Sequence, residues 1–524
     1  MSRKIESRNL YKNAFTKETE LFQIEDCPVK KKSPLVAFLT AFLIVITISM
    51  FAFVDCVHFG KAQTSTQTAT SNSVTQLWRS QVKGSVVYGP TVTEGYVYSV
   101  SGWFGGFGSR LYCFNASSGN QVWNLSVSQR NSIVINEGYI YTGAYNGSTG
   151  TFYALNASTG EQLWYLTDLK SIYAPTVDQS CVYFSCDNYT IFEGTDASFV
   201  YALDALTGAQ KWRYTAISTP RFFSPVVADG FVYAVGEVLP DDVWNSSALY
   251  AFSAFSGTIM WNSTFAGYPG GPVVDGSLVY VSSSRRDENR NIFAGDIHAF
   301  DRFTGVEAWT FTTGGEVSSA VVSMEGVVYV GSADRNIYAL NASDGTKLWN
   351  YTTVATAGTP VIANGNIYVN SGGNLYCLNA FTGKKIWNYT TEGPTSSRPT
   401  VNGDLVYFGS EGPVAFATFT NHTLYALNAL TGKKIWSYTI EGSVGTPVVS
   451  GNVLYFCSSS STFESIDWQE DGAVYAIRPP ALSASPSPSV EFPLWPDLAL
   501  VIIVAAVMVG IGLLLYFKKR KRAS

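Results

Sequence analysis

The side chains that most often carry out chemistry are sparse in this 524-residue chain and are not grouped along it. The three histidines, His58, His298 and His422, make no metal-ligand spacing, and none of the seven cysteines forms a Cys-x-x-Cys pair. No Gly-x-Ser-x-Gly nucleophile elbow and no phosphate-binding loop occurs. The sequence therefore predicts no catalytic residue, no metal ligand and no cofactor-binding residue.

The distribution of charge narrows the kinds of partner. The formal net charge is −5 at pH 7, but basic residues gather at the two ends of the chain. Residues 35–517 contain 21 Lys and Arg against 34 Asp and Glu, a net charge of −13. Such an acidic body lacks the basic surface that nucleic-acid binding requires, so we predict no nucleic-acid partner.

Two apolar stretches lie near the ends of this acidic region. Residues 35–54 and 498–517 are each twenty residues long without a charge, which is enough to cross a bilayer as a helix. Three lysines precede the first stretch and five basic residues follow the second. Because basic flanks stay in the cytoplasm, both ends of the chain are predicted to be cytoplasmic and the region between the stretches extracytoplasmic. A signal peptide cleaved before Gln63 is the alternative for the first stretch.

The region between the apolar stretches is dominated by one repeated line. It appears as VYALDALTGAQKW at 200–212 and LYALNALTGKKIW at 424–436, and a Val-rich line such as TPVIANGNIY at 359–368 precedes it. Dipeptides such as Asp229-Gly230 predict a tight hairpin between the first two strands, and a Thr-Gly turn leads to a last strand that carries Trp. Four strands in roughly 45 residues are typical of a β-propeller blade, so we predict an all-β propeller.

The two ends of the repeat array complement each other. The last unit stops at Val474–Ile477 without a Trp strand, and Leu77-Trp78-Arg79 is a Trp strand without a preceding unit. Pairing them would close the ring and leave no open sheet edge. Counting the Trp strands predicts nine blades, with eight as the alternative; the Trp residues are Trp78, Trp123, Trp164, Trp212, Trp261, Trp309, Trp349, Trp387 and Trp436.

The predicted order of segments follows from these patterns. It is a cytoplasmic tail (1–34), a transmembrane helix or signal anchor (35–54), a linker (55–74), the propeller (75–479), a Pro- and Ser-rich stalk (480–497), a transmembrane helix (498–517) and a basic cytoplasmic tail (518–524).

The motif Ala-x-Asp/Asn-x-x-Thr-Gly-x-x-x-Trp, repeated over about residues 75–478, resembles the tryptophan-docking repeat of the pyrroloquinoline-quinone (PQQ)-like propellers. The resemblance implies that each repeat Trp is structural and packs between neighbouring blades. That superfamily includes quinoprotein alcohol dehydrogenases and also non-enzymatic scaffolds, such as the propeller lipoprotein of the bacterial outer-membrane barrel-assembly machine. The stalk and basic stop, with Glu491-Phe492-Pro493, resemble the C-terminal tails of archaeal surface proteins.

The resemblance leaves several function classes open. A quinoprotein dehydrogenase would need a general-base Asp, acidic calcium ligands and an aromatic floor for the quinone, and many carry adjacent cysteines, which this chain lacks. We therefore expect a binding or scaffold protein at the cell surface, with a protein or glycan partner. A dehydrogenase that uses PQQ and calcium is the first alternative, and a surface-layer or adhesion component is the second.

The predicted binding residues lie between the second and third strands of the units, where the spacing varies most. These connections emerge on one face of the ring, and insertions confined to one face often carry binding. The predicted rim comprises Phe192, Glu193, Asp241, Asp242, Trp244, Arg285, Arg286, Asp287, Glu288, Phe416, Phe419, Asp467, Trp468 and Asp471. Trp244 and Trp468 lie outside the repeat and are the expected anchors.

Eleven Asn-x-Ser/Thr sequences are possible glycan acceptors in an exported protein. Several are by-products of the repeat. Asn188, Asn245 and Asn421 fall in the variable connections and are the favoured sites.

Overall fold

The computed structural model describes residues 68–69, 73–102, 109–127, 133–145, 149–178, 180–187, 197–217, 221–238, 246–287, 291–317, 322–412, 422–462, 469–480 and 482–483. The chain separates into two compact units, Gln67–Ala484 and a second unit of Met1–Thr66 with Ser485–Ser524. The second unit lies outside the described residues, and so do both predicted membrane spans and both predicted cytoplasmic tails. Within the described ranges, no helix is long and apolar enough to span a membrane.

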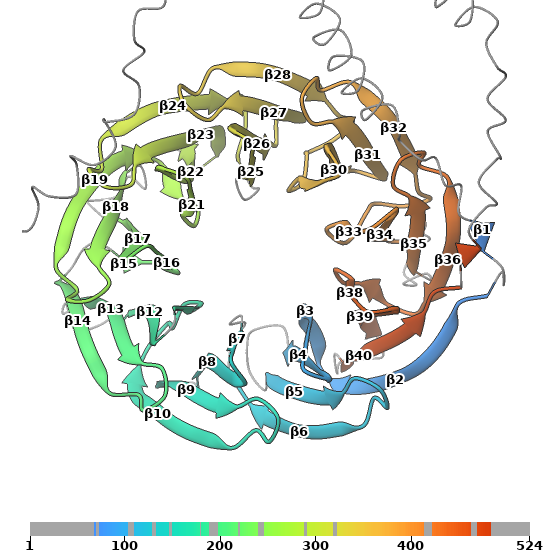
Figure 1. Cartoon of the computed structure of the whole chain (residues 1–524), viewed down its shortest axis with the longest axis horizontal. Helices are drawn as coiled ribbons and strands as arrows, with labels where there is room; N and C mark the ends of the chain where they lie inside the picture. The colour runs from blue at the N-terminus through green and yellow to red at the C-terminus, as the bar shows by residue number, and fades with distance from the viewer. Residues whose placement is uncertain are drawn as a thin grey trace, which may run out of the picture. The chain divides into compact units, whose positions relative to one another are not determined.

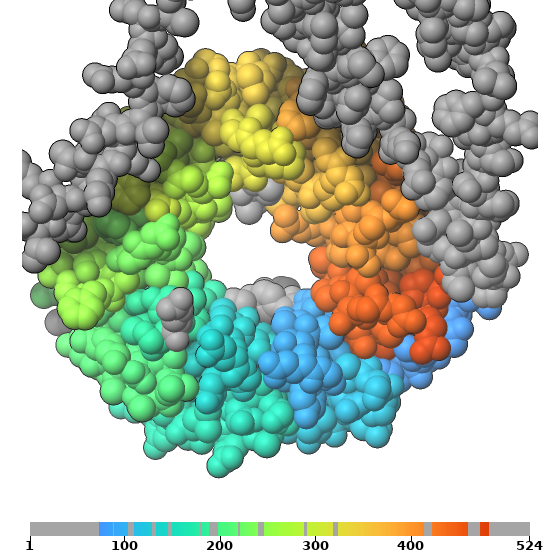
Figure 2. Space-filling model, viewed as in Figure 1, coloured from blue at the N-terminus to red at the C-terminus, as the bar shows by residue number. Residues whose placement is uncertain are grey.

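The first unit is a ring of nine four-stranded antiparallel sheets, the blades, which confirms the count of nine over the alternative of eight (Figure 1). Each blade runs from an inner strand near the centre of the ring to an outer strand at the periphery (Figure 1), and the space-filling view shows an opening at the centre (Figure 2). In blades 4, 5 and 9 the inner strand is split into two short pieces, and all of the pieces pair with the second strand.

The strands of blades 1 to 5 follow one another along the chain. They are β3 (Ser85–Thr93), β4 (Tyr96–Gly102), β5 (Arg110–Asn115) and β6 (Gln121–Ser126); β7 (Val134–Asn136), β8 (Tyr139–Tyr145), β9 (Gly150–Asn156) and β10 (Gln162–Leu169); β11 (Thr176–Val177), β12 (Cys181–Asp187), β13 (Ala197–Asp204) and β14 (Gln210–Ile217); β15 (Arg221–Phe222), β16 (Val226–Ala228), β17 (Phe231–Glu237), β18 (Ser246–Ser253) and β19 (Ile259–Ala266); β20 (Tyr268–Pro269), β21 (Val273–Asp275), β22 (Leu278–Arg286), β23 (Ile292–Asp301) and β24 (Glu307–Thr313).

Blades 6 to 9 complete the ring. Their strands are β25 (Val322–Met324), β26 (Val327–Gly331), β27 (Asn336–Asn341) and β28 (Lys347–Thr352); β29 (Val361–Ala363), β30 (Asn366–Ser371), β31 (Asn374–Asn379) and β32 (Lys385–Thr390); β33 (Thr400–Asn402), β34 (Leu405–Ser410), β35 (His422–Asn428) and β36 (Lys434–Ile440); β37 (Ser443–Val444), β38 (Val448–Ser450), β39 (Val453–Thr462), β40 (Gln469–Arg478) and β2 (Thr75–Lys83). A short pair, β1 (Thr68–Ala69) with β41 (Leu482–Ser483), stands apart from the blades.

The ring closes through the N-terminal Trp strand, as the sequence predicts. Strand β2 pairs antiparallel with β40 and forms the outer strand of blade 9, with Trp78 opposite Ala476. Segments almost 400 residues apart in the chain therefore share one sheet, as Arg79 and Tyr475 illustrate with a hydrogen bond of 2.9 Å across a separation of 396 residues. Closure satisfies the edge of β40 that would otherwise expose unpaired backbone groups.

The tight hairpins on one side of each blade also follow from the sequence. Asp229 and Gly230 have φ of 45° and 82°, and Asn364 and Gly365 have φ of 52° and 70°. Two consecutive residues with positive φ define the type I′ turn, whose twist matches that of paired strands.

Neighbouring blades are joined by the repeat Trp residues. The indole Nε1 of eight of them donates to a backbone carbonyl of the next blade at 2.8–3.0 Å; the pairs are Trp78–Ala116, Trp123–Ala157, Trp164–Ala205, Trp212–Ala254, Trp261–Arg302, Trp309–Ala342, Trp349–Ala380 and Trp387–Ala429. Each of these indoles also lies against the Gly of the next blade's Thr/Ser/Asp-Gly turn, so closely that a Cβ there would meet the ring at 2.4–2.6 Å. Glycine is required at these turns both by contact and by positive φ.

The junction of blades 8 and 9 differs from the others. Trp436 is buried, but its Nε1 has no hydrogen-bond partner among the described residues. The reason is topological. Blade 9 receives its outer strand from the N-terminus, so no Thr-Gly turn follows β40.

Candidate binding face on blades 3 to 5

The described part of the chain includes few of the predicted rim residues. Phe192, Glu193, Asp241, Asp242, Trp244, Glu288, Phe416, Phe419, Asp467 and Trp468 lie outside the described residues, as do the favoured glycan acceptors Asn188, Asn245 and Asn421. Asp471 lies within strand β40 opposite Lys83, and its placement in a loop was wrong.

The second strands are longer than the sequence suggests. Strand β22 continues to Arg286, and β39 continues to Thr462. The added residues of blades 5 and 9 therefore lengthen a paired hairpin, and their connections are shorter than the spacing between Tyr residues implies. Arg285 and Arg286 accordingly lie at the end of a strand, not in a loop.

Arg285, Arg286 and Asp287 are tied to their own blade. The Arg285 guanidinium pairs with the Asp296 carboxylate at 2.8 Å, and the Arg286 guanidinium lies 5.9 Å from the ring centre of Tyr268. The Asp287 carboxylate accepts a hydrogen bond of 2.8 Å from the backbone N–H of Asn291. These contacts fix the base of the β22–β23 hairpin and orient the two Arg side chains.

A buried polar cluster lies at the same ends of blades 3 and 4. Asp187, the last residue of β12, is 4% exposed. Its carboxylate accepts hydrogen bonds from the hydroxyls of Ser198 (2.9 Å) and Tyr173 (3.1 Å) and lies 3.7 Å from Nε of Arg221 in blade 4. Ser198 also accepts a hydrogen bond of 3.0 Å from the backbone N–H of Phe222. The cluster therefore links two blades through a single carboxylate.

The second carboxylate of the cluster is less well satisfied. Glu237 is the last residue of β17, lies opposite Arg221 in the sheet register, and is 3% exposed. Among the described residues, no donor lies within hydrogen-bond distance of its Oε1. A buried carboxylate oxygen without a donor is costly, because it has lost its water and gained no replacement.

Burial sets the ionisation of both acids. It raises the pKa of Asp187 to about 6, although the hydrogen bonds from Ser198 and Tyr173 and the charge of Arg221 oppose the shift. Burial also raises the pKa of Glu237, again against the charge of Arg221. Two acids that take up protons nearer to neutral pH than exposed carboxyl groups do can exchange protons or hydrogen bonds with a ligand.

Aromatic rings extend this cluster into blade 5. Phe223 makes edge contacts with Tyr173 at 5.5 Å and with Tyr268 at 5.7 Å between ring centres. Tyr268 in turn contacts the Arg286 guanidinium. The polar cluster and this aromatic bridge thus connect the strand ends of three consecutive blades, each of which leads into a variable connection.

One further constellation has the order of a nucleophile triad. The Ser283 hydroxyl lies 3.1 Å from Nε2 of His298, and Nδ1 of His298 lies 2.8 Å from the Glu307 carboxylate. Ser283 is only 1% exposed and His298 5%, so no substrate can reach the hydroxyl in this conformation. The network joins the second, third and fourth strands of blade 5.

Sequence reasoning missed Asp187 and Glu237, but a signal for them exists. Both stand four residues after the buried Tyr of the second strand, Tyr183 in unit 3 and Tyr233 in unit 4. Aligning the units with one another would have shown an acid at the same register position in two adjacent blades.

The family described as outer membrane protein assembly factor BamB (PQQ_2) matches residues 68–296, 289–357 and 352–479. The chain belongs to this family. Its repeats therefore have the fold that the Trp motif suggested.

Individual relatives differ in activity. The chain is 25% identical to a tetrathionate hydrolase of Acidithiobacillus ferrooxidans over 58% of its length and 66% of the relative, and 29% identical to a polyvinylalcohol dehydrogenase of a Pseudomonas species over 38% and 40%. It thus spans about two thirds or less of these relatives. The crystal structure of BamB from Moraxella catarrhalis matches 66% of this chain and 96% of that one at 15% identity, with a TM-score of 0.44. Membership of the family therefore establishes the fold, and activity must be argued from the site.

Proposed function

We propose that this protein is a membrane-anchored, extracytoplasmic scaffold that binds a protein partner through the face at the ends of blades 3 to 5. The observation that carries the proposal is a pair of partly exposed side chains, Arg286 and Tyr268, which lie beside the buried acids at the ends of three consecutive blades. Both can bind a protein surface through hydrogen bonds and ring contacts, and Arg286 also through its charge.

The composition of this face supports a protein ligand. Arg286 and Tyr268 lie beside the polar cluster, and the predicted anchor Trp244 belongs to the connection that follows Glu237 in the chain. Arg, Tyr and Trp are the residues that most often dominate the binding energy of protein interfaces. A family named for an assembly factor is consistent with this choice.

The test is quantitative recovery of a partner cross-linked to the full-length chain in its native cells. We expect Trp244→Ala, and separately Arg286→Ala, to lower recovery about tenfold, because each removes an anchor worth roughly 1.4 kcal/mol or more. Gly403→Ala, in a hairpin on the opposite face, is the control and should have no effect on recovery. Loss of the partner with Gly403→Ala, but not with the other variants, would place the binding site on the opposite face and contradict the proposal.

An enzymatic role would give a different result. A dehydrogenase similar to the polyvinylalcohol dehydrogenase should develop sharp absorption above the protein band when PQQ and calcium are added to the purified chain. That outcome, with an unchanged partner yield in the Arg286→Ala variant, would overturn the scaffold proposal in favour of catalysis.

A further inference from the structure

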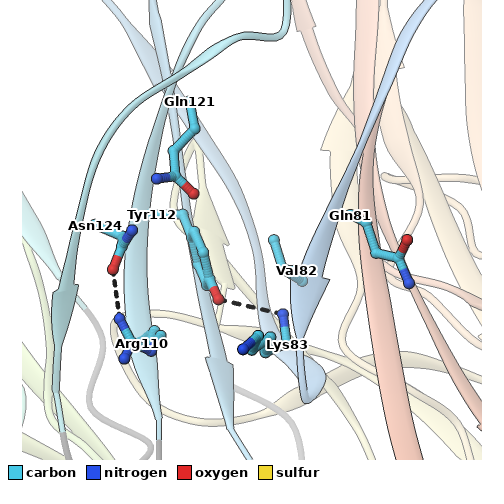
Figure 3. A pocket seen from close by; sticks show the side chains of 7 residues that line it. All are labelled: Gln81, Val82, Lys83, Arg110, Tyr112, Gln121 and Asn124. Atoms are coloured by element: carbon cyan, nitrogen blue, oxygen red, sulfur yellow. Dashed lines mark hydrogen bonds between the residues drawn. The ribbon is translucent and has the colours of Figure 1, made fainter.

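The junction at which the ring closes contains a pocket of about 580 Å³ on the outer part of the blades (Figure 3). It is lined by Gln81, Val82 and Lys83 of β2, by Arg110 and Tyr112 of β5, and by Gln121 and Asn124 of β6. The pocket lies between blade 9 and blade 1 and is separated from the face on blades 3 to 5 by blade 2 (Figure 1), and it does not depend on the function proposed for that face. Its volume falls within the range of small-molecule sites.

This junction lacks an aromatic ring that several others have. The residue two positions after the repeat Trp packs on the next blade in blades 5, 6 and 7, with ring centres 5.3–5.8 Å apart in the pairs Phe311–Tyr338, Tyr351–Tyr376 and Tyr389–Tyr425. In β2 that residue is Ser80, whose hydroxyl donates to the Gly119 carbonyl of blade 1 at 2.5 Å. Blade 4 also has a serine there, Ser263, but Phe265 fills the space at 4.8 Å from the His298 ring. The closing strand has the smaller Val82 in that place.

The lining is cationic and rich in amides. Lys83 and Arg110 contribute two positive charges, and none of the seven lining residues is an acid. Arg110 is the only basic residue at its position in the repeat, where the other eight units have Thr, Phe, Ala, Asp or Asn. Its guanidinium donates to the Asn124 side-chain carbonyl at 2.5 Å, which holds it at the edge of the pocket (Figure 3). The backbone N–H of Lys83 donates to the Tyr112 hydroxyl at 3.2 Å.

We propose that this pocket binds a carboxylated sugar of the uronic acid class. A carboxylate matches the fork of a guanidinium and the point charge of an ammonium group. The Gln121 amide offers both a donor and an acceptor, and the Asn124 amide offers its N–H donors, which suits hydroxyls that also donate and accept. A simple inorganic anion would use the two cations and leave the amide groups of Gln121 and Asn124 without a role.

The test is titration calorimetry of the full-length chain with D-glucuronate, and with D-glucose and acetate as matched probes. The chain is prepared without glycosylation, because Asn124 begins an acceptor sequence. We expect saturable binding of glucuronate, and binding about tenfold weaker or absent for glucose, which lacks the charge, and for acetate, which lacks the hydroxyls. Equal affinity for acetate would reduce the site to a general anion site, and equal affinity for glucose would remove the role of the cations; either result overturns the proposal.

Variants locate the binding. Ser80→Tyr introduces the aromatic residue found at this position in blades 5, 6 and 7 and should abolish glucuronate binding without lowering the unfolding midpoint. Should Ser80→Tyr not fold, Lys83→Gln and Arg110→Gln decide the question, and each should weaken binding roughly fivefold, the effect of one partly exposed ion pair. Lys385→Gln is the control, because Lys385 makes the same kind of contact with Asn388 in blade 7, at 3.1 Å, with no effect expected on binding. Binding that survives both charge variants lies elsewhere and contradicts the assignment.

Discussion

Replacing a single glycine should separate the cost of a strained backbone from the cost of losing the contact between blades. Gly383 has φ of +66°, and a Cβ there would meet the Trp349 ring at 2.6 Å. Gly365, in the same blade, has φ of +70°, and its nearest contact would be Phe381 at 4.0 Å. The two positions are thus matched in backbone conformation and differ in the presence of the indole.

The expected magnitudes follow from this difference. Gly365→Ala should cost ~1–2 kcal/mol for placing a Cβ in the left-handed region. Gly383→Ala should cost the same amount and an additional ~1–3 kcal/mol for overpacking against Trp349. Trp349→Ala alone should cost ~3–5 kcal/mol, the usual range for removing a large core side chain, because it also removes the hydrogen bond of 3.0 Å to the Ala380 carbonyl.

A double-mutant cycle isolates the contact. In the Trp349→Ala protein, Gly383→Ala should cost no more than Gly365→Ala. The effects of Trp349→Ala and Gly383→Ala on the free energy of unfolding should therefore be coupled by at least ~1 kcal/mol. Urea unfolding followed by far-UV circular dichroism gives the midpoints and slopes for all four proteins, and a constant slope is required before they are compared. The reasoning fails if Gly383→Ala and Gly365→Ala have the same midpoint, or if the penalty at Gly383 persists undiminished in the Trp349→Ala protein.

Three further predictions test the hydrogen bonds between blades, the polar cluster around Asp187 and the membrane topology. Trp387→Phe should cost ~0.5–1.5 kcal/mol more than Trp436→Phe in thermal unfolding, because the Trp387 indole donates to the Ala429 carbonyl, whereas the Trp436 indole has no acceptor among the described residues; equal costs would contradict the assignment. The pKa of Asp187 is raised from 3.8 to about 6, so the folded protein binds this proton more tightly and the free energy of unfolding should fall as the pH rises from about 4 to 6. Asp187→Asn should remove this loss, which is up to roughly 3 kcal/mol, when unfolding midpoints at pH 4 and pH 7 are compared. An unchanged pH dependence would exclude Asp187 as its source. Protease added to intact cells should degrade the region 56–496 and spare both tails; a protected propeller would overturn the predicted topology.

The fold could be predicted from the sequence because its determinants are repeated. Each determinant acts locally: the positive-φ turn at Asp229-Gly230 sets a hairpin, the alternating side chains set the strands, and the strand around Trp78 lacks a partner in its own unit. Together they define nine blades and the closing strand. Strand lengths were predicted less well. Continuation of β22 as far as Arg286 depends on cross-strand contacts such as Arg285 with Asp296, which the spacing of Tyr residues does not encode.

The polar cluster could not be predicted from any single unit. Asp187 and Glu237 belong to different blades, and Arg221 comes between them only when the ring places blade 3 beside blade 4. Each acid looks unremarkable at the end of its own strand. Their raised pKa values arise from burial by neighbouring units, a property of the assembled ring rather than of local sequence.

A ring of similar blades provides its own internal comparison. Most positions that hold the ring together recur from unit to unit, so a departure from the repeat at a position that faces another blade can be recognised. Ser80 stands where blades 5, 6 and 7 have an aromatic residue, and Arg110 brings a charge to a position where no other unit has a basic residue. Both departures occur at the junction of blades 9 and 1, where the strand that carries Ser80 lies against the blade that carries Arg110. A guanidinium that no other unit has at this position, beside the amides of Gln121 and Asn124, is what an anionic ligand requires of its site.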